Sequence, residues 1–219
     1  MSPHPVALRE RLLRGLDQLG LALPETVVDK LLDYVALLHK WNRAYNLTAV
    51  RDPEAMVSRH LLDSLAVIPH LRGNRFADIG TGAGLPGIPL ALTRPDWRFT
   101  LVDSNGKKIR FVTQAIAELR ITNVEAIQCR VEELQPDVRF DGVLSRAFAT
   151  LADMAQGCSH LLTDDGALFA LKGIYPAQEL SELPEHYKVD ACLPLQVPDA
   201  DGERHLVIAR PGSATAARA

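Results

Sequence analysis

Hydrophobic positions recur with a helical period through roughly the first third of the chain. Between residues 24 and 41, apolar side chains occur at intervals of three and four, which is typical of an amphipathic helix. Residues 6–19 and 53–69 have the same period. Asp52 followed by Pro53 predicts an N-cap and a first helical residue for the last of these segments. We therefore expect the N-terminal part to be helical.

From residue 75 onward, the pattern changes to short apolar runs that favour β-strands. Helix-length stretches at 105–120 and 150–162 separate some of the runs. This alternation predicts βαβ crossovers and a largely parallel sheet. The predicted strands are 75–80, 98–103, 123–129, 140–145, 166–172, 187–195 and 204–210.

Length and pattern together predict an N-terminal helical extension over 1–72, an α/β core over 73–211 and a flexible tail over 212–219. No apolar run approaches the roughly 20 residues of a membrane span, and arginines interrupt the N-terminal leucines, so we expect a cytoplasmic protein without a secretory signal. The formal net charge of −3 disfavours nucleic-acid binding by bulk charge alone, but a local basic face stays possible. The three cysteines and seven histidines lack metal-ligand spacing, so we predict buried thiols and no metal.

A glycine-rich turn follows the first predicted strand. Residues 82–87 formally match the dinucleotide fingerprint GxGxxG, but the match is out of register, because the strand already ends at Gly80. Asp78 lies two residues before that glycine and would repel a pyrophosphate. The pattern Asp78-x-Gly80-x-Gly82-x-Gly84 suits a ligand that carries a positive charge. The competing interpretation is that Asp78 only caps backbone amides.

S-adenosylmethionine is a ligand of this kind, since it has a sulfonium and a ribose but no phosphate. Two further elements fit it. Asp103 ends the second predicted strand, where a carboxylate can accept from both ribose hydroxyls. Val131 and Glu132 follow the third strand, on the adenine side. All of these residues come at carboxyl ends of strands, where α/β sheets bind ligands. We therefore predict an S-adenosylmethionine site.

The loop after the fourth strand, Ser145-Arg146-Ala147-Phe148, limits the methyl acceptor. It lacks the Asn/Asp-Pro-Pro-aromatic run that grips an exocyclic amine. Methylation at C5 of a pyrimidine needs a cysteine nucleophile, and neither Cys129 nor Cys158 is well placed. A lone-pair acceptor that needs no activation remains, for example a ring nitrogen. Arg146 is the candidate nearest the chemistry; alternatively, it pairs with an acid such as Asp141.

The chain closely resembles the bacterial ribosomal RNA small subunit methyltransferase G family, also called glucose-inhibited division protein B. The segments that carry the resemblance are WNRAYNLTAVRD (41–52), RHLLDSL (59–65), DIGTGAGLPGIPLA (78–91), LVDSNGKKIRF (101–111), RVEEL (130–134), SRAFA (145–149) and ALKG (170–173).

The resemblance implies a Rossmann-like class I methyltransferase fold with a seven-stranded, mostly parallel sheet. It further implies that S-adenosylmethionine methylates N7 of guanosine 527 of 16S rRNA, in the 530 loop near the decoding region. The partner would be 16S rRNA or the small ribosomal subunit. The family's cofactor contacts correspond to Gly80, Leu85, Val131, Glu132 and Arg146.

N7 of guanine has no proton to lose, so we expect in-line transfer that depends on positioning and needs no general base. Lysines in the first turn of a helix oppose its dipole and hint at phosphate contacts. His60 and Asp63 lie one turn apart and could be a simple surface pair. Trp41 and Tyr45 could stack on a base, although Trp41 fits the apolar helix face. We predict RNA contacts at Asn46, Arg51, His60, Lys107, Lys108, Arg110 and Lys172.

Two other functions stay open. The out-of-register GxGxxG permits a nicotinamide-dependent oxidoreductase, which NADH binding would reveal. A module that binds rRNA without catalysing transfer would keep the fold and lack the activity. We expect a monomer.

Overall fold

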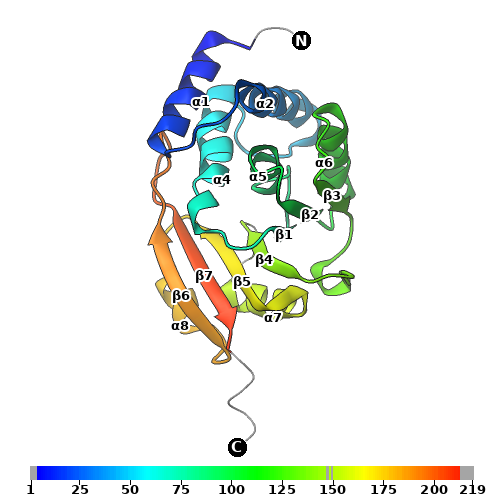
Figure 1. Cartoon of the computed structure of the whole chain (residues 1–219), viewed down its shortest axis with the longest axis vertical. Coiled ribbons are helices and arrows are strands. Elements are labelled where there is room, and N and C mark those ends of the chain that lie inside the picture. The colour runs from blue at the N-terminus through cyan, green and yellow to red at the C-terminus, as the bar shows by residue number, and fades with distance from the viewer. Residues whose placement is uncertain (1–3, 147, 149, 213–219) are drawn as a thin grey trace, which may run out of the picture.

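Helices form the N-terminal part of the chain, as expected (Figure 1). The computed structural model describes residues 4–146, 148 and 150–212. Within them, none of the helices is long and apolar enough to cross a membrane. The N-terminal elements are α1 (Val6–Gln18), α2 (Glu25–Tyr45), α3 (Pro53–Met56), the π-helix η1 (Val57–Leu62), α4 (Asp63–Leu65) and the 3₁₀ turn η2 (Ile68–His70).

The prediction of one continuous α-helix over 53–69 is wrong, because the π-helix η1 interrupts it. Its start is confirmed, because the Asp52 carboxylate accepts from the Ala55 backbone N–H at 3.0 Å and Pro53 is the first helical residue. The segment then widens into η1 before α4 begins. A π-helical turn shifts every later side chain around the helix axis, and such insertions are frequent at functional sites.

Seven strands form one sheet in the order β3-β2-β1-β4-β5-β7-β6. Neighbours from β3 to β5 are parallel, whereas β7 is antiparallel to both β5 and β6. The predicted, mostly parallel sheet is confirmed, although β5 begins four residues earlier than expected. The strands are β1 (Arg75–Ile79), β2 (Arg98–Val102), β3 (Val124–Ile127), β4 (Phe140–Ser145), β5 (Leu162–Lys172), β6 (Tyr187–Pro194) and β7 (His205–Pro211).

Apolar cores cover both faces of this sheet, which explains why its central strands are almost continuously hydrophobic. Successive residues alternate between the two cores: in β5, Phe169 packs on the side of the N-terminal helices, and Leu168 packs on the other side. Helices α5 (Gly87–Thr93) and α6 (Gly106–Glu118) join the first core. Helices α7 (Leu151–Cys158) and α8 (Ala177–Ser181) lie against the second.

The N-terminal helices share their core with the sheet and do not have one of their own. Leu31 and Leu38 of α2 and Leu61 of η1 belong to the same buried cluster as Phe76 of β1. The division at residue 72 therefore stays a prediction. Most of the predicted tail, residues 213–219, lies outside the described residues.

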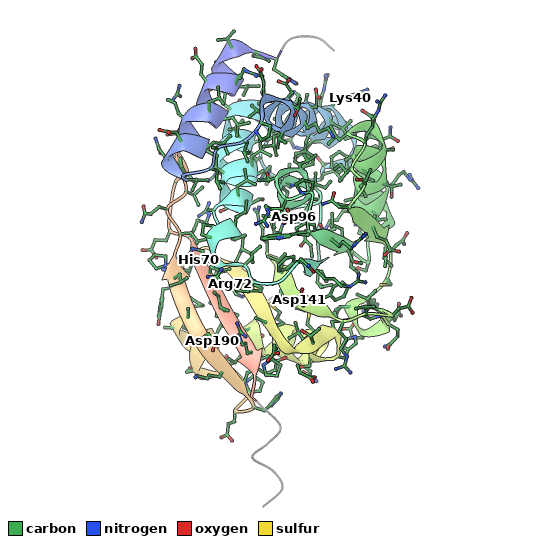
Figure 2. All side chains as sticks on the ribbon, in the orientation of Figure 1. Lys40, His70, Arg72, Asp96, Asp141 and Asp190 are labelled. Carbon is green, nitrogen blue, oxygen red and sulfur yellow. The ribbon has the colours of Figure 1, made fainter. Side chains whose placement is uncertain are left out.

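The two ends of the parallel strands differ in what they carry. Arg72, Asp96 and Asp141 lie at the amino ends of β1, β2 and β4 (Figure 2). At this end, Asp141 accepts from the backbone N–H groups of Asn74 and Arg75 at 2.8 and 3.0 Å, so it serves the turn into β1. The glycine-rich turn and the other predicted cofactor residues follow the opposite, carboxyl ends.

Candidate active site at the carboxyl end of the sheet

The glycine-rich turn after β1 depends on its glycines for two different reasons. Gly80, Gly82 and Gly84 all have positive φ angles, of 68°, 60° and 85°. A Cβ on Gly82 would approach only the Gly80 carbonyl, at 3.9 Å, so backbone conformation is what requires that glycine. A Cβ on Gly84 would come within 2.4 Å of the Ile88 side chain. The turn is therefore tightly packed on α5 and open on its other side.

The Asp78 side chain stabilises the glycine-rich turn by hydrogen bonding. It is fully buried, and its Oδ2 atom accepts from the Thr81 hydroxyl at 2.6 Å and from the Gly87 N–H at 2.8 Å. Burial raises the pKa of the Asp78 carboxyl to about 6, and these hydrogen bonds partly offset that effect. These contacts agree with the alternative interpretation of Asp78 as a cap for backbone groups. A contact with the cofactor stays a prediction.

Tyr34 of α2 also holds this turn. Its hydroxyl donates to the Ala83 carbonyl at 2.7 Å, and the side chain is completely buried. Burial raises the pKa of the Tyr34 phenol well above its ordinary value, so the hydroxyl stays protonated. The N-terminal helices thus support the glycine turn directly. Tyr34 lies in the apolar helical pattern of α2, so its polar role had no local signal in the sequence.

A first cavity of about 200 Å³ opens above the ends of β1, β2 and β3. It brings together four of the predicted cofactor residues, although they are up to 52 positions apart in the chain. The first cavity is lined by Ile79, Gly80, Val102, Asp103, Ser104, Cys129, Arg130, Val131 and Glu132.

Asp103 is held rigidly at the edge of the first cavity. Its Oδ2 atom accepts from the Gly82 N–H at 3.0 Å, and its Oδ1 atom accepts from the Asn105 N–H at 2.9 Å. Lys108 lies 3.4 Å from the same carboxylate. The unfavourable position of this lysine in the first turn of α6 is therefore explained by Asp103 and does not require a phosphate.

A second cavity, of about 210 Å³, lies on the other side of the sheet centre, over the ends of β4, β5 and β7. It shares no lining residue with the first. The second cavity is lined by Asp63, Arg146, Leu171, Lys172, Gly173, Leu195, Arg204 and His205.

Asp63 is the centre of the second cavity's charge network. This buried carboxylate lies 3.1 Å from an Arg146 guanidinium nitrogen through one oxygen and accepts from Arg204 Nε at 3.1 Å through the other. Lys172 donates to Glu179 at 2.7 Å. Two predictions are corrected here: Asp63 and His60 do not form a surface pair, and the partner of Arg146 is Asp63, not Asp141.

His60 lies inside the protein and does not line the second cavity. It is 4% exposed, and its ring contacts the Thr48 hydroxyl at 2.9 Å and the Arg59 carbonyl at 3.0 Å. Burial, reinforced by the positive charge of Arg146, lowers the pKa of the His60 imidazole to about 4. The ring is therefore neutral near pH 7. Its burial weighs against the predicted direct contact with RNA.

The remaining predicted residues are cofactor candidates and RNA candidates. Gly82, Gly84 and Leu85 shape the glycine turn without lining the first cavity, and Arg146 lines the second cavity instead. Of the RNA candidates, Lys108 and Lys172 are engaged with carboxylates. Ala147 and Ala149 of the loop after β4 lie outside the described residues. The RNA candidates on the surface are Asn46, Arg51, Lys107 and Arg110.

Trp41 is partly buried, as its helix pattern favoured, and packs against Phe111 with ring centroids 5.7 Å apart. Tyr45 stacks on Trp41 at 5.1 Å and is 38% exposed. The three thiols are free: Cys158 is buried, as predicted, whereas Cys129 and Cys192 are only partly buried, and burial raises the pKa of each. Among the described residues, no group of three or more histidines, cysteines and acids could hold a metal ion.

Solved structures of low sequence identity share this fold. The glycopeptide N-methyltransferase MtfA, complexed with S-adenosyl-L-methionine, is 13% identical with a TM-score of 0.60 over 70% of this chain and 88% of its own. A SAM-dependent methyltransferase from Aquifex aeolicus is 17% identical with a TM-score of 0.57 over 72% and 93%. The expected class I methyltransferase fold is confirmed.

Curated relatives are far more similar. Ribosomal RNA small subunit methyltransferase G from Aeromonas salmonicida is 55% identical over 90% of this chain and 95% of its own length. The protein of that name from an Enterobacter strain is 53% identical over 92% and 97%. These matches do not support the oxidoreductase alternative, and they confirm S-adenosylmethionine as the cofactor. Residues 27–207 match the family described as rRNA small subunit methyltransferase G, and the chain belongs to this family.

Proposed function

We propose that this protein transfers a methyl group from S-adenosylmethionine to N7 of a guanosine in 16S rRNA, guanosine 527 by family resemblance. The observation that most supports this proposal is the pair of separate cavities at the carboxyl end of the sheet. Two carboxylates and one arginine line the first cavity, whereas three cations and one carboxylate line the second, so the balance of charge suits a cationic cofactor in the first and an anionic RNA at the second. Arg146, directly after the central strand β4, belongs to the second.

The residues of the first cavity fit the cofactor. Gly80 lines the cavity with no side chain, which lets a ligand approach its backbone. The Asp103 carboxylate is already oriented by two backbone N–H groups, and a carboxylate can accept further hydrogen bonds from hydroxyls. Val131 and Glu132 form the far wall. We infer that Asp103 holds the ribose and that Val131 and Glu132 lie beside the adenine.

The proposed reaction requires the protein to position the cofactor and the guanine, and it requires no general base. When bound, the cofactor would supply an electrophilic methyl group, which the lone pair of guanine N7 would attack in line as the sulfur–methyl bond breaks and its electron pair stays on sulfur. Asp63 is held between two guanidinium groups, and His60 is buried with a lowered pKa, so neither is arranged as a general base. The three thiols have raised pKa values, which disfavours the cysteine nucleophile of C5 methylation.

The RNA partner would approach over the second cavity and over the exposed cations Lys107 and Arg110 in the first turns of α6, which follows the carboxyl end of β2. Its guanine has to be drawn out of the surrounding RNA to reach the cofactor, as in other enzymes that act on a base.

The test is methyl transfer from labelled S-adenosylmethionine to small subunits from cells that lack this modification. We expect one labelled nucleotide, identified as N7-methylguanosine at the proposed position. Asp103→Ala is the negative control. Transfer to another position or atom would contradict the assignment. Binding of the subunit without transfer would support the non-catalytic alternative.

A further inference from the structure

Two adjacent apolar side chains, Ile174 and Tyr175, project from the loop between β5 and α8. Ile174 is 76% exposed and Tyr175 is 53% exposed. They are the only two of the exposed large apolar residues in the described part of the chain that are neighbours in sequence. Single exposed apolar side chains are common on protein surfaces, whereas adjoining ones beside polar groups are typical of a contact with another molecule. The pair is therefore a candidate contact with a partner.

The loop that carries the pair lies at the end of the sheet where the candidate active site is. Lys172 ends β5 and Gly173 begins the loop, and both line the second cavity. The Tyr175 ring packs edge-on against His205, which also lines that cavity, with ring centroids 5.6 Å apart. Ile174 and Tyr175 themselves do not line it. The pair therefore stands next to the second cavity and outside it.

The loop is held at both of its ends. Lys172 donates to the Glu179 carboxylate of α8 at 2.7 Å, and the same carboxylate accepts from the Leu151 N–H at 2.8 Å. Pro176 is buried, and its carbonyl accepts from the Leu180 N–H at 2.9 Å. The exposed pair is thus presented from a well-anchored backbone. A partner that binds it has little chain to order, which lowers the entropic cost of the contact.

RNA is the partner whose chemistry fits this position. A guanine that is drawn into the site loses its stacking on the neighbouring bases, whose flat faces become exposed. Exposed bases stack on aromatic side chains, and apolar side chains inserted between bases hold them apart. Lys172 and Arg204 line the adjoining cavity, and these cations favour an anionic partner over an uncharged one.

We propose that Ile174 and Tyr175 form an apolar wedge that packs against the RNA bases next to the target guanine and replaces the stacking that this guanine has lost. This inference rests on the proposed function. Every base has an apolar face, so the wedge favours opening of the RNA and contributes little to the choice of sequence. A protein of the small subunit is the competing partner, and it predicts a different result in the test.

Photocrosslinking identifies the partner of the pair directly. A photoreactive phenylalanine analogue replaces Tyr175 in one protein and Val138 in the control. Val138 is also an exposed apolar residue, at 57%, but it precedes β4, at the amino end of the sheet. Each protein is irradiated with undermodified small subunits and S-adenosylhomocysteine, which has no methyl group to transfer, and the crosslinked nucleotides are mapped by primer extension.

We expect crosslinks from position 175 to nucleotides next to the methylated guanosine, and none there from position 138. A map from position 175 that lacks these nucleotides would overturn the proposal, whether it shows a ribosomal protein, distant rRNA or nothing. If the wild type still methylates N7 in that case, the proposed function stands. If the wild type methylates another atom, the proposed function fails and the crosslink map still decides which molecule the pair contacts.

Kinetics show whether the contact acts on the drawn-out guanine. Tyr175→Ala should lower the single-turnover rate at saturating cofactor and subunits about fivefold or more, the effect of one lost stacked base. Tyr175→Phe keeps the ring and should retain nearly the full rate, and Val138→Ala should not change it. S-adenosylmethionine affinity and thermal unfolding, measured in parallel, should stay the same. Equal rates for Tyr175→Ala and Tyr175→Phe would contradict the wedge, and Ile174→Ala provides a second variant if Tyr175→Ala does not fold.

Discussion

The two cavities are similar in volume but differ in how far apart in the sequence their lining residues lie. The first comes from three successive strand ends, β1, β2 and β3, and its residues all lie between positions 79 and 132. The second takes residues from α4, the loop after β4, the end of β5 and the start of β7, across positions 63 to 205. A site made of consecutive strand ends leaves short motifs in the sequence, whereas a site made by chain topology does not.

The cavities also differ in how their charged groups are held. Backbone N–H groups orient Asp103 in the first cavity, so its geometry depends on one local turn. Side chains from distant elements orient one another in the second, through Asp63. We therefore expect a substitution at Asp103 to act on the cofactor and one at Arg204 to act on the RNA, whereas Arg146 stays a predicted cofactor contact.

The largest expected effect is that of Asp103→Ala on cofactor affinity. A hydrogen bond to a charged group contributes about 1.5–3 kcal/mol, so loss of the ribose contacts should weaken S-adenosylmethionine binding at least tenfold by calorimetry. Asp96→Ala is the control, because Asp96 is an exposed acid paired with Arg94 at the amino end of the same strand. Equal cofactor affinity in the two variants would remove Asp103 from the site.

A somewhat smaller effect is expected on the exposed RNA-binding surface. Lys107 and Arg110 are exposed on α6. Lys108 is left unchanged, because it contacts Asp103 and its replacement would also alter the first cavity. The double variant Lys107→Glu with Arg110→Glu should flatten the salt dependence of subunit binding by about 1.5, the contribution of two phosphates. Cofactor affinity should not change. An identical slope would show that these residues only face solvent.

A roughly fivefold loss of cofactor affinity is expected for Tyr34→Phe. This substitution leaves the buried Ala83 carbonyl without its donor and loosens the glycine turn, at a cost of about 1 kcal/mol. Tyr187→Phe is the matched control: it also removes a phenol that hydrogen-bonds, to Ser159 at 2.8 Å, but in the core on the other face of the sheet. If both variants lower stability and neither changes calorimetric affinity, the Tyr34 contact is structural only.

The smallest expected effect is that of pH on the methyl-transfer step. Single-turnover rates at saturating cofactor and subunits should be nearly constant from about pH 6.5 to 8.5, because N7 needs no base and His60 stays neutral in this range. A rising limb that disappears in His60→Gln would identify His60 as a proton acceptor and contradict the mechanism.

Stability should respond to His60 at lower pH. Because the folded-state pKa is lowered from 6.5 to about 4, the folded protein binds this proton less tightly than the unfolded chain. The His60 contribution to stability is therefore lost as pH falls from about 6.5 to 4. Urea unfolding of the wild type and His60→Gln over this range should show a smaller decline in the variant.

The sequence predicted most of the fold and four of the nine residues that line the first cavity, because strand and helix periods and the glycine turn are local. It missed the π-helical turn before Asp63, since the apolar period of 53–69 does not reveal an inserted residue. It also missed Tyr34 and Arg204, whose partners lie 49 and 141 positions away. The site role of Arg146 stays a prediction, and the acid that it contacts, Asp63, was missed because that contact depends on how the N-terminal helices pack on the sheet.

The most direct test of the division between the cavities is a pair of titrations on Asp103→Ala and Arg204→Gln. S-adenosylmethionine affinity and affinity for undermodified small subunits are measured for each protein. We predict a crossed pattern: Asp103→Ala loses cofactor affinity at least tenfold and keeps subunit affinity, whereas Arg204→Gln loses subunit affinity and keeps cofactor affinity. If both variants weakened binding of the same ligand, the two cavities would not hold separate substrates.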